Sequence, residues 1–175
     1  MFEIQPMDAA TFRQQTRRST IIIAVLFLVL AMLLSSLAVA LFGEPGGDNL
    51  RFNVGGVFVA FLVTAGLLRG RFWHQTWMAP AVYSWRLKRS LMSITNVMHQ
   101  VTAGVERDDQ TAMKVLRFYH LGLMQMHELD GNSSDHTQLW REVQDHKERM
   151  QAVGLDTEQT RLDPVWLEGL KQAPR

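Results

Sequence analysis

The sequence predicts an all-α protein in which a two-helix transmembrane hairpin is followed by a cytoplasmic antiparallel helical bundle of three to four helices. Two apolar runs, residues 20–42 and 52–68, contain neither a charged residue nor a histidine. Beyond residue 80, apolar residues recur at alternating spacings of three and four, a pattern typical of packed helices. No stretch of alternating apolar and polar residues indicates a strand.

The two apolar runs are the predicted membrane spans. Each is close to the ~20 residues that a helix needs to cross a bilayer, where an unpaired charge is costly and a helix satisfies its own backbone. The connecting loop, residues 43–51, contains Pro45 and Gly46, which favour a tight turn. Because this loop is short, the two helices must be antiparallel neighbours.

The first run could also be a cleaved signal peptide. Arg17 and Arg18 precede it, and Ala38-Val39-Ala40 resembles a cleavage site. A signal-peptide core spans about 7–15 residues, whereas this run has 23. We therefore expect an uncleaved span.

Small residues in both spans indicate close helix packing. They are Ala31, Ser35, Gly55, Gly56, Ala60, Gly66 and Gly70. Packing inside the hairpin explains them, and so does a dimer face or a docking face for another membrane protein.

The distribution of charge predicts the topology. Arginines flank the hairpin on both sides, whereas the loop at 43–51 has no positive excess. Positive residues accumulate on the cytoplasmic side, so we expect both termini there and an outward-facing loop. The expected parts are a cytoplasmic N-terminal segment (1–19), the hairpin (20–71), and a juxtamembrane anchor with the bundle (72–175).

A group of arginines and tryptophans predicts anchoring at the membrane surface. Tryptophan prefers the headgroup zone, and arginine side chains extend towards it. The expected anchor residues are Arg17, Arg18, Arg69, Arg71, Trp73 and Trp77. Their predicted partner is a lipid bilayer with anionic headgroups, and we expect no binding of nucleic acid.

Helical spacing continues to the end of the bundle. Pro80 suits the first turn of a helix, Gly131 and Gly154 suit helix ends, and Asp163-Pro164 suits a helix start. Asp108 is the expected N-cap of the second helix, and Asp135 with Gln138 resembles a capping box. The expected seam residues are Leu87, Leu91, Ile94, Met98, Val101 and Val105, then Ala112, Leu116, Tyr119, Leu123 and Met126, then Leu139, Val143, His146, Met150 and Val153.

Histidine and methionine residues in the bundle are the candidate ligand-binding residues. His120, Met124 and His127 share one helical face, and His146 lies on the next predicted helix. Imidazole and thioether groups suit a soft metal. The other interpretation is that the methionines fill the core and the histidines are hydrogen-bonded within it, and we favour this one.

Several chemistries find no support in the sequence. The chain has no cysteine, which excludes disulfides and thiolate catalysis. The spans carry no histidine for haem and no ionisable residue for a transport path. No phosphate-binding loop or hydrolase motif is present. We expect a protein that is not an enzyme and has no cofactor.

Three stretches resemble a known family: residues 1–6, 16–20 and 35–43. They resemble small gammaproteobacterial inner-membrane proteins classed as a domain of unknown function. This resemblance implies two spans and a bacterial inner membrane, and it assigns no functional residue.

We expect a membrane-anchored interaction protein, an accessory subunit or scaffold that docks a protein partner, or a second copy of itself, at the cytoplasmic face of the bacterial inner membrane. The alternative is a metal or small-ligand sensor built on the histidines and methionines of the bundle.

Overall fold

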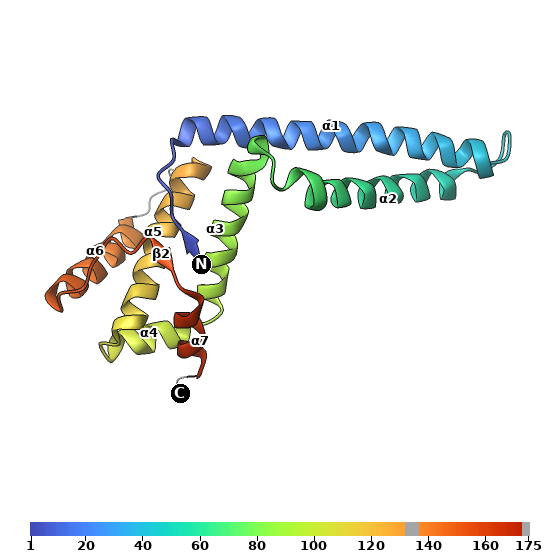
Figure 1. Ribbon diagram of the computed structural model, residues 1–175. Helices are drawn as coiled ribbons and strands as arrows, with labels where there is room; N and C mark the ends of the chain where they lie inside the picture. Colours follow the sequence, from blue (N-terminus) through green and yellow to red (C-terminus); the bar gives the residue numbers. More distant parts are fainter. Residues whose placement is uncertain (132–136, 173–175) are drawn as a thin grey trace. The chain divides into compact units, whose positions relative to one another are not determined.

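The computed structural model describes residues 1–131 and 137–172 (Figure 1). It confirms an all-α fold in which two long helices precede a helical bundle. The chain divides into two compact units: Gln14–Val82, and Met1–Arg13 together with Tyr83–Arg175. We call these the hairpin unit and the bundle unit. The first residues of the chain therefore belong to the same unit as the bundle, instead of forming a segment of their own.

Two antiparallel helices form the hairpin unit (Figure 1): α1 (Ala9–Phe42) and α2 (Leu50–Leu67). A π-helical turn, Leu68–Phe72, continues α2 and carries Arg69 and Arg71. At the tip of the hairpin Gly46 has a φ of 76°, the conformation expected for a glycine in a turn.

Small residues let the two helices approach closely. A Cβ atom at Gly56 would overlap the backbone of Ser35, and Ala60 is fully buried. The Ser35 hydroxyl also donates to Asn53 Oδ1 at 2.7 Å. A Cβ at Gly55 or Gly66 would instead meet open space. Packing within the hairpin thus explains Gly56 and Ala60, but it does not explain Gly55 or Gly66.

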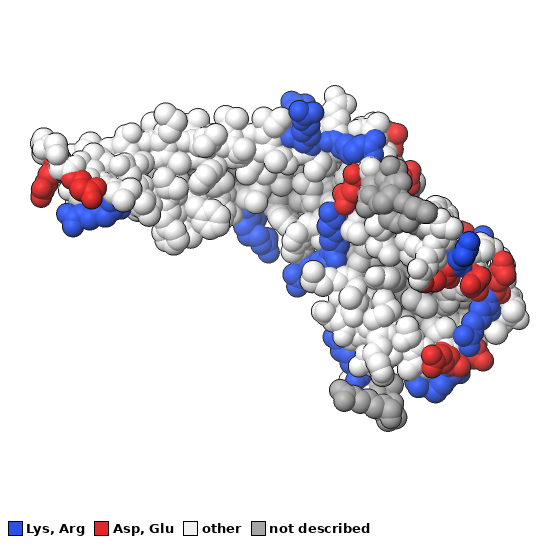
Figure 2. Space-filling view, turned by 180° about the vertical axis from the view of Figure 1, so that it is seen from behind, with Lys and Arg blue, Asp and Glu red and all other residues white. Residues whose placement is uncertain are grey.

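The outer surface of the hairpin is apolar. The most apolar 18-residue windows of the two helices have mean hydropathies of 3.0 and 1.7, and only 6% and 17% of them are buried. Figure 2 shows a face without charged side chains between the charged ends of the hairpin. Both helices are long and apolar enough to cross a membrane, and they are too exposed to be the core of a soluble unit.

In the described part of the bundle unit there are five helices: α3 (Ala79–Thr95), which begins in the hairpin unit, α4 (Met98–Glu106), α5 (Gln110–Asp130), α6 (Thr137–Ala152) and α7 (Pro164–Gln172). The central helix is α5, which packs against α4, α6 and α7. The side chains of Leu87 and Leu91 on α3 lie against Gly122 of α5, where a Cβ would be 3.2 and 2.9 Å from them.

The core of the bundle follows the predicted spacing in part. The seam residues of α3 and α4 are buried, apart from the half-buried Met98. They are buried although the helix is interrupted between Thr95 and Met98. On α5 the predicted seam is half-buried except for Ala112, which is 0% exposed, and other deeply buried residues lie beside the seam. These are Met113, Val115 and Phe118, also 0% exposed. This helix is central, so it buries more than one face.

Helix ends agree with the expected residues at most positions. Gly131 ends α5 with a φ of 68°, Gly154 has a φ of 72° after α6, and Asp163 Oδ1 accepts from the Val165 N–H at the start of α7. The prediction for α5 was wrong by one residue. Asp109 caps it, accepting from the N–H groups of Thr111 and Ala112. The expected capping box at Asp135 lies outside the described residues.

A short sheet ties the N-terminus to the bundle. Strands β1 (Phe2–Glu3) and β2 (Arg161–Leu162) pair antiparallel, which the sequence did not predict. The Phe2 ring packs against the rings of Tyr83 and Phe118, with centroids 5.6 and 6.3 Å apart. With only two residues in each strand, the packing of Phe2 stabilises this contact more than the ladder does.

Candidate functional site

Two of the candidate histidines meet inside the bundle unit. His120 of α5 and His146 of α6 are each 6% exposed, and their ring centroids are 5.3 Å apart at an interplanar angle of 82°. Helices α5 and α6 pack against each other, which brings the two rings together.

A hydrogen bond fixes the tautomer of His146. His146 Nε2 lies 3.0 Å from the carbonyl oxygen of Met113, so this nitrogen carries the proton and donates. His120 Nδ1 is buried and has no hydrogen-bond partner in the described part of the chain. A buried ring nitrogen without a partner is uncommon and costs stability.

The surroundings keep both rings neutral at physiological pH. Burial, the neighbouring His146 and the cationic Arg117 together lower the pKa of His120 from 6.5 to about 4. Burial also lowers the pKa of His146, and its hydrogen bond to Met113 opposes this effect in part. Neutral imidazoles can donate and accept hydrogen bonds at neutral pH, but they contribute no positive charge.

A buried arginine that is not among the residues predicted for the site supports this region. Arg117 is 4% exposed, and its guanidinium donates to the carbonyl oxygens of Thr157 and Val143 at 2.8 and 3.4 Å. Burial lowers the pKa of its guanidinium, and Glu158 opposes this shift. Its spacing on α5 is that of a core residue, which is the signal that could have identified it.

A cavity of about 560 Å³ adjoins the histidine pair. Tyr119 and His120 of α5, and Glu142, Asp145, His146 and Arg149 of α6, form its polar lining, and Leu116 and Val105 are among its apolar residues. This volume is within the usual range for small-molecule pockets. The lining combines hydrogen-bonding and charged groups with apolar surface.

The other two candidate metal ligands lie elsewhere. Met124 and His127 are not among the residues that line this cavity. Within residues 1–131 and 137–172, no group of three histidine, aspartate or glutamate side chains is placed to hold a metal ion.

The expected anchor residues lie in the hairpin unit. Arg17 and Arg18 are exposed on α1, and the Arg69 guanidinium lies 5.6 Å from the centre of the Trp73 ring. Trp73 and Trp77 do not share a helix, because the π-helical turn that carries Arg69 and Arg71 ends at Phe72. Trp77 belongs to a separate 3₁₀ turn, Thr76–Met78, and its backbone oxygen accepts from the buried Ser19 hydroxyl at 2.6 Å.

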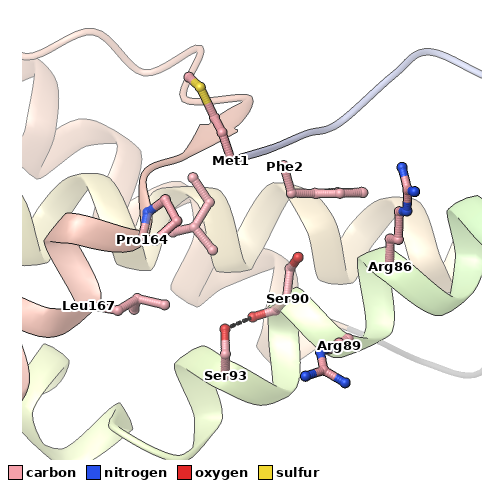
Figure 3. Close-up of a pocket in the computed structure, with 9 residues that line it drawn as sticks. Met1, Phe2, Arg86, Arg89, Ser90, Ser93, Pro164 and Leu167 are labelled. Atoms are coloured by element: carbon pink, nitrogen blue, oxygen red, sulfur yellow. Dashed lines mark hydrogen bonds between the residues drawn. The ribbon is translucent and has the colours of Figure 1, made fainter.

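A second cavity, of about 400 Å³, lies beside α3 in the bundle unit (Figure 3). Arg86, Arg89, Ser90 and Ser93 supply its α3 side. Met1, Phe2, Leu162, Pro164 and Leu167 supply the other sides. The sequence places the two arginines in a basic stretch, but it does not show that β1 and β2 would enclose a hollow next to them.

Fold and surface together define the class of this protein: a helical bundle joined to a hairpin of two helices long and apolar enough to cross a membrane. The chain belongs to the family described as "Protein of unknown function (DUF3087)", whose model matches residues 2–167. No curated protein and no solved structure matches the chain.

Proposed function

We propose that this chain is a membrane-anchored interaction protein without enzymatic activity, which docks a protein partner at the cytoplasmic face of a bacterial inner membrane. The apolar hairpin supports the anchoring, because its exposed surface needs an apolar solvent. Arginines at both of its flanks support cytoplasmic termini and contact with anionic headgroups.

One surface of α3 supports the docking. Trp85 and Met92 are 48% and 65% exposed, and they are seven residues apart on one helical face. Between them, the Arg89 guanidinium lies 5.2 Å from the centre of the Trp85 ring. Tryptophan, methionine and arginine are enriched in protein interfaces, and tryptophan and arginine dominate their binding energy.

The docking proposal is tested by crosslinking in native membranes, followed by mild-detergent purification of the full chain and three variants. We expect Trp85→Ala and Met92→Ser each to reduce the stoichiometric partner, or the dimer, at least fivefold. Trp140→Ala removes a tryptophan that is 58% exposed on α6 and serves as the control. Equal recovery of the complex from the wild type and both α3 variants would reject this surface, and recovery of the monomer alone would reject the proposal.

A second function is favoured by the His120–His146 cavity: binding of a small polar ligand that the bundle senses. The observation behind it is the His120 Nδ1 atom, buried without a partner in the described chain beside a cavity with acidic and basic groups. Ligand retention by the purified chain, measured by mass spectrometry of the denatured eluate, should be lost in His120→Gln and kept in His127→Gln. Elemental analysis of the same samples tests for a bound metal. Equal and sub-stoichiometric metal contents in all of them would reject metal binding.

A further inference from the structure

The cavity beside α3 has two chemically different sides. Arg86, Arg89, Ser90 and Ser93 follow one another at helical spacing, so they lie on one face of α3. Figure 3 shows the two serines on this side and the side chains of Phe2 and Leu167 on the sides around them. One part of the lining thus carries cations and hydroxyl groups, and the rest is apolar.

The cationic side has no compensating acid among the described residues. The ion pairs of the described chain join Lys88 to Asp130, Arg149 to Asp108, and Arg161 to Glu3. Neither arginine of the cavity takes part in one, and no carboxylate lines the cavity. Both arginines are exposed and extend from the edge of the cavity in different directions (Figure 3), and the Arg89 guanidinium lies 5.2 Å from the centre of the Trp85 ring.

Three acids stand next to lining residues in the sequence: Glu3, Asp163 and Glu168. Glu3 Oε1 accepts from Arg161 Nε at 3.0 Å, and Asp163 Oδ1 accepts from the Val165 N–H at 3.0 Å. Among the described residues, none of the three forms an ion pair with Arg86 or Arg89. A planar guanidinium prefers phosphate or carboxylate, and the Ser90 hydroxyl can donate to the same oxygens, whereas the Ser93 hydroxyl donates to the Ser90 carbonyl oxygen at 2.6 Å.

The apolar part of the lining restricts the ligand further. The accessible apolar surface comes from Met1, which is 80% exposed, from the exposed Pro164 and from the half-buried Phe2, whereas Leu162 and Leu167 are already buried. A small phosphate ion would leave this surface unused. A ligand with an anionic head and an apolar tail would bury it, and about 400 Å³ is enough for the head and the first part of a tail.

We propose that the cavity formed by Arg86, Arg89, Ser90 and Ser93 of α3 with Phe2 and Leu167 binds a phosphate-bearing amphiphile, with the phosphate at the arginines and serines and the tail against the apolar side. The expected source is an anionic phospholipid, and this choice of source rests on the proposed membrane location.

The test uses the full chain in a neutral detergent and native mass spectrometry to count bound lipids. The probes are dihexanoyl phosphatidylglycerol and glycerol 3-phosphate. We expect one tightly bound phosphatidylglycerol, and at least tenfold weaker binding in the Arg86→Gln/Arg89→Gln variant. The control is Arg107→Gln/Arg141→Gln, which removes the same charge from exposed positions outside the cavity and should bind as the wild type does.

Each of the following outcomes would overturn the proposal. Equal losses in the two double variants would mean that only net charge attracts the lipid. Equal affinity for glycerol 3-phosphate would mean that the tail is not bound. A Ser90→Leu variant, in which the new side chain fills the cavity and no charge changes, must also lose the tight lipid. These measurements do not depend on a protein partner, so their failure is separate from a failure of the docking proposal.

Discussion

Two glycines in helices of the bundle unit have opposite surroundings. A Cβ at Gly104 of α4 would lie 2.6 Å from the Cβ of Ala112 on α5, whereas a Cβ at Gly169 of α7 would meet nothing within 4 Å. Helix α4 continues past Gly104 to Glu106. The role of Gly104 is to let α4 and α5 approach closely. The sequence could not show this, because the contact joins two helices.

We predict that Gly104→Ala destabilises the protein by about 1 kcal/mol or more, because the overlap with Ala112 outweighs the gain in helix propensity. Gly169→Ala adds the same methyl group without an overlap and should stabilise by about 0.5–1 kcal/mol. Urea unfolding of both variants in detergent, followed by circular dichroism, measures the difference. Stabilisation by both changes would contradict the close packing.

The two buried histidines predict a stability that depends on pH. The folded-state pKa of His120 is about 4, below the unfolded value of 6.5, and that of His146 is also lowered. Between these values the unfolded chain binds more protons than the folded chain, so stability is full above pH 6.5 and falls as the pH decreases towards 4. The loss from His120 is on the order of 3 kcal/mol at its largest.

Unfolding midpoints measured between pH 7.5 and 4.5 check this dependence. His120→Gln should flatten the decrease, because glutamine cannot be protonated in the unfolded chain. His127→Gln, a change outside the cavity, should leave the decrease as it is in the wild type. A wild-type midpoint that does not change over this range would mean that the rings are not held neutral.

At the scale of the elements, the residues at helix ends were easier to predict than the contacts between distant elements. Gly131 and Asp163 act locally, through the backbone next to them, so the sequence identifies them. The pairing of β1 with β2 depends instead on residues about 160 positions apart, and each strand has only two residues. So short an element carries no periodic signal. The pair of His120 and His146 was proposed from the sequence, but the cavity beside α3 was not, because β1 and β2 supply part of its lining.

The N-terminal strand is held by a hydrogen-bond network around one tyrosine. The Tyr83 hydroxyl accepts from the Gln5 N–H at 3.0 Å and donates to Gln125 Oε1 at 2.6 Å. Gln125 Nε2 in turn donates to the Gln5 carbonyl oxygen at 2.5 Å. We predict that Tyr83→Phe costs about 1–3 kcal/mol, because it leaves partly buried polar groups without their partner.

Limited proteolysis of the N-terminal segment, together with the unfolding midpoint, measures this loss. The control is Tyr119→Phe, which removes the same atom from the same bundle outside this network. If cleavage before residue 9 is as slow in Tyr83→Phe as in the wild type, the network does not hold the strand.

For the whole molecule, the absence of cysteine gives a direct test of topology. We predict that a cysteine introduced at Asp48 reacts with an impermeant maleimide in intact cells, and that one at Lys171 reacts only after lysis. The loop at 43–49 has no positive excess, whereas arginines flank both outer ends of the hairpin. A reporter fused after Arg175 should be active in the cytoplasm. Labelling of Lys171→Cys in intact cells would overturn the proposed orientation.

The bond between Glu3 and Arg161 spans 158 positions, which has a consequence for biosynthesis. At roughly 5–20 residues per second, a ribosome needs about 8–30 s to make the chain between these residues. During that interval Phe2 lacks the strand with which it pairs, and both apolar helices are synthesised before that strand. A nascent chain stalled before β2 would display an uncovered aromatic end that chaperones and proteases can recognise.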